Sequence, residues 1–128
     1  MNIAILCTVV LGLLLFGLGL NVSVTRKRYA KGIGHDAGPN DPVHRAVRAH
    51  GNTAEYAPFM AVLFLWYAAH GAPTWINITI AIATLARLLL AAGLLWGGPL
   101  NQPNPFRAVG ALFTYLAGLV LTASLLAV

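Results

Sequence analysis

Charged side chains are scarce in this sequence of 128 residues: only 9% are charged, and just three of those are acidic. Soluble domains carry about 25% charged residues, so the composition excludes an ordinary cytosolic enzyme and a disordered tail. A single cysteine, Cys7, excludes an internal disulfide and a metal site built from several cysteines. The remaining composition, 59% hydrophobic, is typical of a membrane protein.

Long apolar runs divide the chain into four expected helices, at about 3–25, 42–69, 75–96 and 106–128. A membrane-crossing helix needs roughly 20 apolar residues. The chain therefore has room for four such helices with short connections between them. The sequence predicts an all-α integral membrane protein, a single four-transmembrane-helix bundle over residues 1–128.

Basic residues gather around the first connection. Six of the eight Lys and Arg residues lie between positions 26 and 48, and the second connection holds none. The positive-inside rule then predicts that the first and third connections are cytoplasmic and that both termini face outward. Positively charged flanks of membrane helices account for the excess of basic residues. We therefore expect membrane lipids, and no nucleic acid, as partners.

A polar stripe runs along the second expected helix. Arg45, Arg48, Asn52 and Glu55 follow one another at intervals of three, four and three residues, so they share a helix face. At about 1.5 Å per residue, Glu55 lies roughly 10 Å deeper than Arg48. A carboxylate exposed to lipid there would cost several kcal/mol. We therefore expect Glu55 to face the protein interior in an ion pair with Arg87 of the third helix.

Two interpretations of the stripe remain open: it holds helices together, or it binds an anionic ligand. The excess of arginine over carboxylate favours a ligand, because a guanidinium recognises carboxylates in a bidentate manner. Tyr115, two turns beyond Arg107, has the same two interpretations, packing or ligand binding. His35, His44 and His70 have no partner at metal-ligand spacing, so no metal site is expected.

The run from Arg48 to Phe59, Arg-Ala-His-Gly-Asn-Thr-Ala-Glu-Tyr-Ala-Pro-Phe, resembles the signature of the MAPEG family, membrane-associated proteins in eicosanoid and glutathione metabolism. The preceding Asn-Val-Ser-Val-Thr-Arg26 is similar to the bacterial branch of that family. The resemblance extends over the whole chain, including an arginine in the third helix and one that opens the fourth.

The resemblance implies a homotrimer that binds glutathione between adjacent subunits near the cytoplasmic face. Arg26 would reach the tripeptide from the neighbouring subunit. Arg107 would be the catalytic residue that polarises the glutathione thiol, since a guanidinium favours the thiolate over a thiol whose ordinary pKa is about 8.5. The glutathione ligands at the other matching positions would be Arg48, Asn52, Glu55 and Tyr56.

The implied function is a glutathione-dependent transferase or peroxidase of a bacterial inner membrane, with glutathione as co-substrate. Its second substrate would be a lipophilic electrophile or a lipid hydroperoxide. The sequence departs from the family pattern at Leu90 and Leu94, where His or Tyr is usual, and at Ala108, where some members have Ser. The alternative is a non-catalytic MAPEG-like protein that binds glutathione or is purely structural. A small multidrug transporter is disfavoured, because the first helix has no acidic residue.

Overall fold

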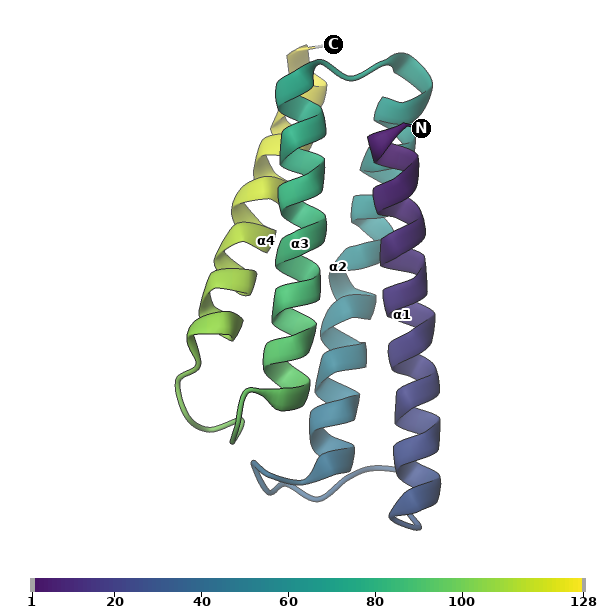
Figure 1. Cartoon of the computed structure of the whole chain (residues 1–128), viewed down its shortest axis with the longest axis vertical. Coiled ribbons are helices and arrows are strands. Elements are labelled where there is room, and N and C mark those ends of the chain that lie inside the picture. The colour runs from purple at the N-terminus through teal and green to yellow at the C-terminus, as the bar shows by residue number, and fades with distance from the viewer. Residues whose placement is uncertain (1, 128) are drawn as a thin grey trace.

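Four long helices form the chain in the computed structural model, which describes residues 2–127 (Figure 1). They are α1 (Ile3–Arg28), α2 (Pro42–His70), α3 (Thr74–Trp96) and α4 (Pro105–Ser124), followed by the short 3-10 helix η1 (Leu125–Ala127). The predicted helices are confirmed, with small differences at their ends. Met1 and Val128, which the predicted domain includes, lie outside the described residues.

The helices run up and down the long axis of the molecule (Figure 1). The α1–α2 and α3–α4 connections lie at one end, and the α2–α3 connection lies at the other end with both termini. The closest packing is between α1 and α2 and between α3 and α4, whereas α2 and α4 barely touch. The bundle therefore consists of two helix pairs, joined mainly by the packing of α3 against both α1 and α2.

Local sequence signals explain where the helices begin and end. The Asp41 side chain accepts a hydrogen bond from the backbone N–H of His44 at 2.7 Å, and Pro42 occupies the first turn. Asn104 caps α4 in the same way, accepting from the N–H of Arg107 at 3.1 Å. Helix α1 extends to Arg28, beyond the expected end near residue 25, since its basic last turn complements the helix dipole.

The apolar core is divided into two clusters along the bundle. One cluster lies toward the termini and includes Leu11, Phe64 and Ile80. The other lies toward the opposite end and includes Leu18 and Leu90. The level between the two clusters is where the polar side chains of α2 and α3 meet.

By length and composition, three of the helices could cross a membrane: α1, α3, and α4 together with η1. Helix α2 has 29 residues but is not among the three, because its first half carries the polar stripe. The sequence-based expectation of four apolar spans therefore holds for three helices. The remaining helix, α2, combines a polar half with an apolar half.

Glycines allow α3 and α4 to approach closely. A Cβ atom added to Gly110 would lie 2.8 Å from the backbone nitrogen of Leu90 and 2.9 Å from the carbonyl oxygen of Ala86. A Cβ at Gly93 of α3 would lie 2.8 Å from Cγ of Arg107. Because backbone atoms cannot yield as flexible side chains do, Gly110 sets the distance between the two helices.

We expect Gly110→Ala to destabilise the protein by about 1–3 kcal/mol, the usual cost of overpacking. The measurement is thermal unfolding of the protein in detergent. Gly12→Ala is the matched control: its Cβ would meet nothing within 4 Å, so helix propensity alone should leave stability unchanged or raise it by up to about 1 kcal/mol. Equal melting temperatures for the two variants would contradict the close α3–α4 contact.

Candidate functional site

Arg87 is completely buried at the level between the two apolar clusters, with 0% of its surface exposed. Its Nη2 donates to Oδ1 of Asn52 at 2.6 Å and to Oγ1 of Thr53 at 3.4 Å. Its Nε and Nη1 have no hydrogen-bond partner among residues 2–127. A guanidinium has five N–H donors, so a large part of the hydrogen-bonding capacity of Arg87 is unused within one chain.

Two tyrosines extend this polar level to α4. The Cζ of Arg87 lies 5.3 Å from the ring centroid of Tyr56, a distance at which a cation is attracted to the face of an aromatic ring. The ring of Tyr56 in turn lies 5.8 Å from the ring of Tyr115. Side chains from α2, α3 and α4 therefore meet at one level of the bundle.

The predicted ion pair between Glu55 and Arg87 is wrong for the single chain. Among the described residues the only ion pair joins Lys31 and Asp36. Glu55 is exposed, and helix geometry explains why. At 3.6 residues per turn, Glu55 points roughly 160° away from Thr53, the fully buried residue that contacts Arg87. An amide and a hydroxyl, rather than a carboxylate, therefore solvate the buried guanidinium.

The polar stripe of α2 divides into an inner and an outer part. Arg45 turns inward, and its Nη2 donates to the carbonyl oxygen of Leu95 at 2.6 Å. Asn52 turns toward Arg87, as described above. Arg48 and Glu55 are exposed on the outer surface of the chain. The stripe thus both joins helices and presents outward a cation and an anion that form no ion pair with another described residue.

Arg107 lies at the start of α4, where its guanidinium holds the α3–α4 connection. It donates to the carbonyl oxygens of Pro99 at 3.1 Å and Leu100 at 3.3 Å, and also to that of Gln102. Its stem packs over Gly93, where a side chain would collide with it. In this arrangement Arg107 is half-buried, and its guanidinium is bound to backbone rather than to another side chain.

Arg26, the other predicted ligand, lies at the same end of the molecule in the last turn of α1. It donates to the carbonyl oxygen of Gly34 and so supports the α1–α2 connection. In this connection the Lys31–Asp36 pair, at 2.8 Å, raises the pKa of Lys31 and lowers that of Asp36 through their shared hydrogen bond. The polar residues of this end therefore stabilise the connections.

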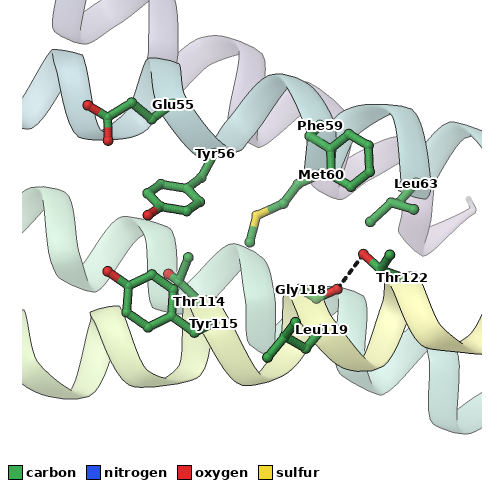
Figure 2. A pocket seen from close by; sticks show the side chains of 10 residues that line it. All are labelled: Glu55, Tyr56, Phe59, Met60, Leu63, Thr114, Tyr115, Gly118, Leu119 and Thr122. Carbon is green, nitrogen blue, oxygen red and sulfur yellow. Dashed lines mark hydrogen bonds between the residues drawn. The ribbon is translucent and has the colours of Figure 1, made fainter.

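An open groove lies between α2 and α4, the two helices that barely touch. It has a volume of about 500 Å³. Figure 2 shows Glu55, Tyr56 and Tyr115 at one end of it, and mainly apolar side chains along the rest. The structure thus adds an apolar site, next to the polar level, that the sequence did not predict.

Thr53 belongs to this polar level but was not among the residues predicted from the sequence. It is completely buried and contacts the guanidinium of Arg87. Intervals of three and four residues do not include Thr53, because it lies off the helix face of Arg48, Asn52 and Glu55. Its position directly after Asn52 is the one sequence feature that links it to the polar stripe.

No group of three or more His, Cys, Asp and Glu side chains within residues 2–127 could hold a metal ion.

The family model of the MAPEG family matches residues 4–127, nearly the whole chain. The chain belongs to the MAPEG family. No curated protein and no solved structure matches it significantly.

Helix α3 of this MAPEG membrane protein is mainly apolar next to Arg87. Leu90 and Leu94 are buried in the second apolar cluster. They pack beside Ala49 of α2 in the same cluster. Arg87 is therefore the polar side chain that α3 contributes to the site at this level.

We expect Asn52→Leu to destabilise the protein by about 1–3 kcal/mol, because the buried guanidinium of Arg87 loses its amide acceptor. The double variant Asn52→Leu with Arg87→Met should recover most of this loss, since an apolar pair needs no hydrogen bond. Thermal unfolding in detergent measures both effects.

Asn101→Leu, in the exposed α3–α4 connection, is the control for adding a leucine. Purely additive effects of the Asn52 and Arg87 substitutions would show that their contact carries no coupling energy.

Proposed function

We propose that this protein is a glutathione-dependent membrane enzyme, a transferase or peroxidase that acts on lipophilic electrophiles or lipid hydroperoxides. Its active form would be a homotrimer. The family includes glutathione-dependent transferases and peroxidases as well as non-catalytic members, so the proposal depends on the site of this chain.

The observation that carries the proposal is the outward-facing pair Arg48 and Glu55, both exposed on α2. Glu55 lies 13 residues after Pro42, about 20 Å along the helix. A carboxylate at that depth facing lipid would cost several kcal/mol. A zwitterionic ligand, covered by a second copy of the chain, would satisfy both charges.

Glutathione has the chemistry that such a face requires. Its ammonium group would pair with Glu55, and a carboxylate would pair with Arg48 in a charge-assisted hydrogen bond. Asn52 and Tyr56, on the same helix, would complete the set, and Arg26 would come from the adjacent subunit. The tripeptide would enter from the cytoplasm, on the side of the basic α1–α2 connection.

Arg107 is the residue we propose for thiol activation. Its guanidinium would stabilise the thiolate of glutathione, which is the reactive nucleophile. In a transferase reaction the thiolate forms a C–S bond with an electrophilic carbon, and a leaving group or a proton balances the charge. In a peroxidase reaction the thiolate attacks one oxygen of the hydroperoxide, which breaks the O–O bond and gives glutathione sulfenic acid and, after protonation, an alcohol. A second glutathione would then condense with the sulfenic acid to give the disulfide and water.

We also propose that α2 crosses the membrane with the other helices, with its polar half covered by ligand and neighbouring subunits. The α1–α2 and α3–α4 connections would then be cytoplasmic. The resemblance of residues 21–26 to the bacterial branch supports a bacterial inner membrane as its location.

A non-catalytic glutathione-binding protein is the second candidate function. Two observations favour it: Leu90 and Leu94 are buried apolar residues, and Arg107 already donates to three backbone carbonyl groups. To activate a thiol, Arg107 would have to exchange at least one of these carbonyl partners for the ligand.

Isothermal titration calorimetry of the detergent-purified protein with glutathione tests ligand binding. We expect Glu55→Gln to weaken binding about tenfold or more, because a hydrogen bond to a charged group contributes about 1.5–3 kcal/mol. Asp36→Asn is the matched control, since Asp36 is an exposed carboxylate of the α1–α2 connection. Equal affinity of the two variants would contradict a role of Glu55 in ligand binding.

Turnover tests thiol activation separately. We expect Arg107→Ala to lower kcat for glutathione conjugation by about 100-fold to 1,000-fold, the usual effect of losing one stabilising donor. The ultraviolet absorbance of bound thiolate should fall in parallel, while the trimer persists in size-exclusion chromatography.

Unchanged turnover in Arg107→Ala would overturn the mechanism. Binding of glutathione by the unmodified protein without any turnover would favour the non-catalytic candidate. Absence of binding would exclude both functions.

A further inference from the structure

Asn52 stands at the boundary between the buried and the exposed side of α2. At about 100° per residue, its side chain is rotated about 40° from the exposed Arg48 and about 100° from the buried Thr53. Asn52 itself is only partly buried. One end of its amide can therefore contact the interior of the bundle while the other end reaches the outer face of α2.

The contact with Arg87 determines which end of the amide faces inward. A guanidinium has N–H donors and no acceptor, so the amide oxygen, rather than the amide nitrogen, must face Arg87. The structure has this arrangement, with Nη2 of Arg87 2.6 Å from Oδ1 of Asn52. Within residues 2–127 this is the only hydrogen bond of the Asn52 side chain, and its Nδ2 remains accessible at the surface. The NH2 group of Asn52 is therefore left with two donors for a group outside the chain.

The guanidinium that sets this orientation is itself held in place. Arg87 is 0% exposed, and the same Nη2 also donates to Oγ1 of Thr53 at 3.4 Å. The ring of Tyr56 lies against the cation, with 5.3 Å between Cζ and the ring centroid. A buried charge has no water to turn to, so releasing the oxygen of Asn52 would leave it poorly solvated. Arg87 therefore keeps the amide in one orientation.

On the outer face of α2, the two donors of Asn52 lie between Arg48 and Glu55. Arg48 is about 6 Å before Asn52 along the helix axis, and Glu55 is about 4.5 Å beyond it. The face thus offers two donor groups in succession and then one acceptor. A carboxylate, with two oxygen atoms, can accept from Asn52 and Arg48 together, beside a ligand ammonium at Glu55.

We propose that Arg87 is a positioning residue that determines specificity: it holds the Asn52 amide so that the NH2 group donates to a carboxylate oxygen of the ligand. The proposal rests on the proposed function, because it takes glutathione as the ligand. Arg87 does not touch the ligand, since its guanidinium is completely buried. An asparagine that is free to turn can donate or accept, whereas Asn52 held by Arg87 only donates.

Asn52→Asp separates the two ends of the amide. The aspartate keeps an oxygen for Arg87, so the variant should unfold at a temperature no lower than that of the unmodified protein. It loses both donors and places a like charge beside the ligand carboxylate, so we expect the affinity for glutathione to fall about tenfold or more. Thermal unfolding and isothermal titration calorimetry of the full-length protein in detergent measure the two effects.

Arg87→Met frees the amide to turn. We expect glutathione to bind about twofold to tenfold more weakly, the usual cost of immobilising one free side chain on binding. Arg45→Met is the matched control. It removes another contact between α2 and α3, the hydrogen bond from Arg45 to the carbonyl oxygen of Leu95, without changing the partner of Asn52.

Truncated peptides distinguish positioning from a general loss of structure. The probes are glutathione, 4-aminobutanoyl-cysteinyl-glycine, which lacks the carboxylate of the glutamyl group, and γ-glutamyl-cysteine methylamide, which lacks the carboxylate of the glycine. The losses of affinity in Arg87→Met and in Asn52→Asp should both disappear with the same truncated peptide, because that peptide lacks the oxygen that Asn52 contacts. Arg45→Met should change the affinity for all three peptides by the same factor.

Equal losses for all three peptides in Arg87→Met, or unchanged glutathione affinity in Asn52→Asp, would overturn the proposal even if the enzyme is active. Losses that depend on one carboxylate, without any turnover, would support the positioning role and contradict the proposed enzymatic function. Absence of peptide binding by the unmodified protein would overturn both.

Discussion

The buried guanidinium of Arg87 is the constraint on which the rest of the structure depends. A charge completely removed from water and lipid must be solvated by the protein, and Asn52 and Thr53 supply oxygen atoms for it. This requirement fixes the register of α2 against α3 and places Tyr56 beside the cation. It also separates the apolar core into two clusters, so that the polar level lies partway along the bundle.

The same constraint explains why one face of α2 turns outward. Once Asn52 and Thr53 point toward Arg87, the helix leaves Arg48 and Glu55 on the outside of the chain. Meanwhile Gly93 and Gly110 draw α4 close to α3, which holds α4 away from α2. The groove and the exposed polar face are thus two consequences of how α3 is packed.

The fold could be predicted from the sequence almost completely, because apolar runs, Asp41-Pro42 and the basic cluster are local signals. Residues that share a helix face were also predictable from spacing. The partner of Arg87 was not, because spacing identifies a face but not its rotation toward a neighbouring helix. A carboxylate is the expected partner of a buried arginine. The rotation of α2 about its axis instead places the amide of Asn52 and the hydroxyl of Thr53 against Arg87.

The groove was beyond sequence reasoning for a related reason. It depends on two helices, α2 and α4, that touch at only a few points, whereas patterns in a sequence identify surfaces that pack closely. Tyr115 shows the consequence: its spacing from Arg107 favoured packing and left ligand binding as the alternative. In the structure the ring of Tyr115 contacts that of Tyr56 at the polar end of an apolar groove, a contact between helices that spacing along one helix does not predict. The phenol beside the buried arginine is that of Tyr56 of α2, and Tyr115 of α4 contacts the Tyr56 ring in turn.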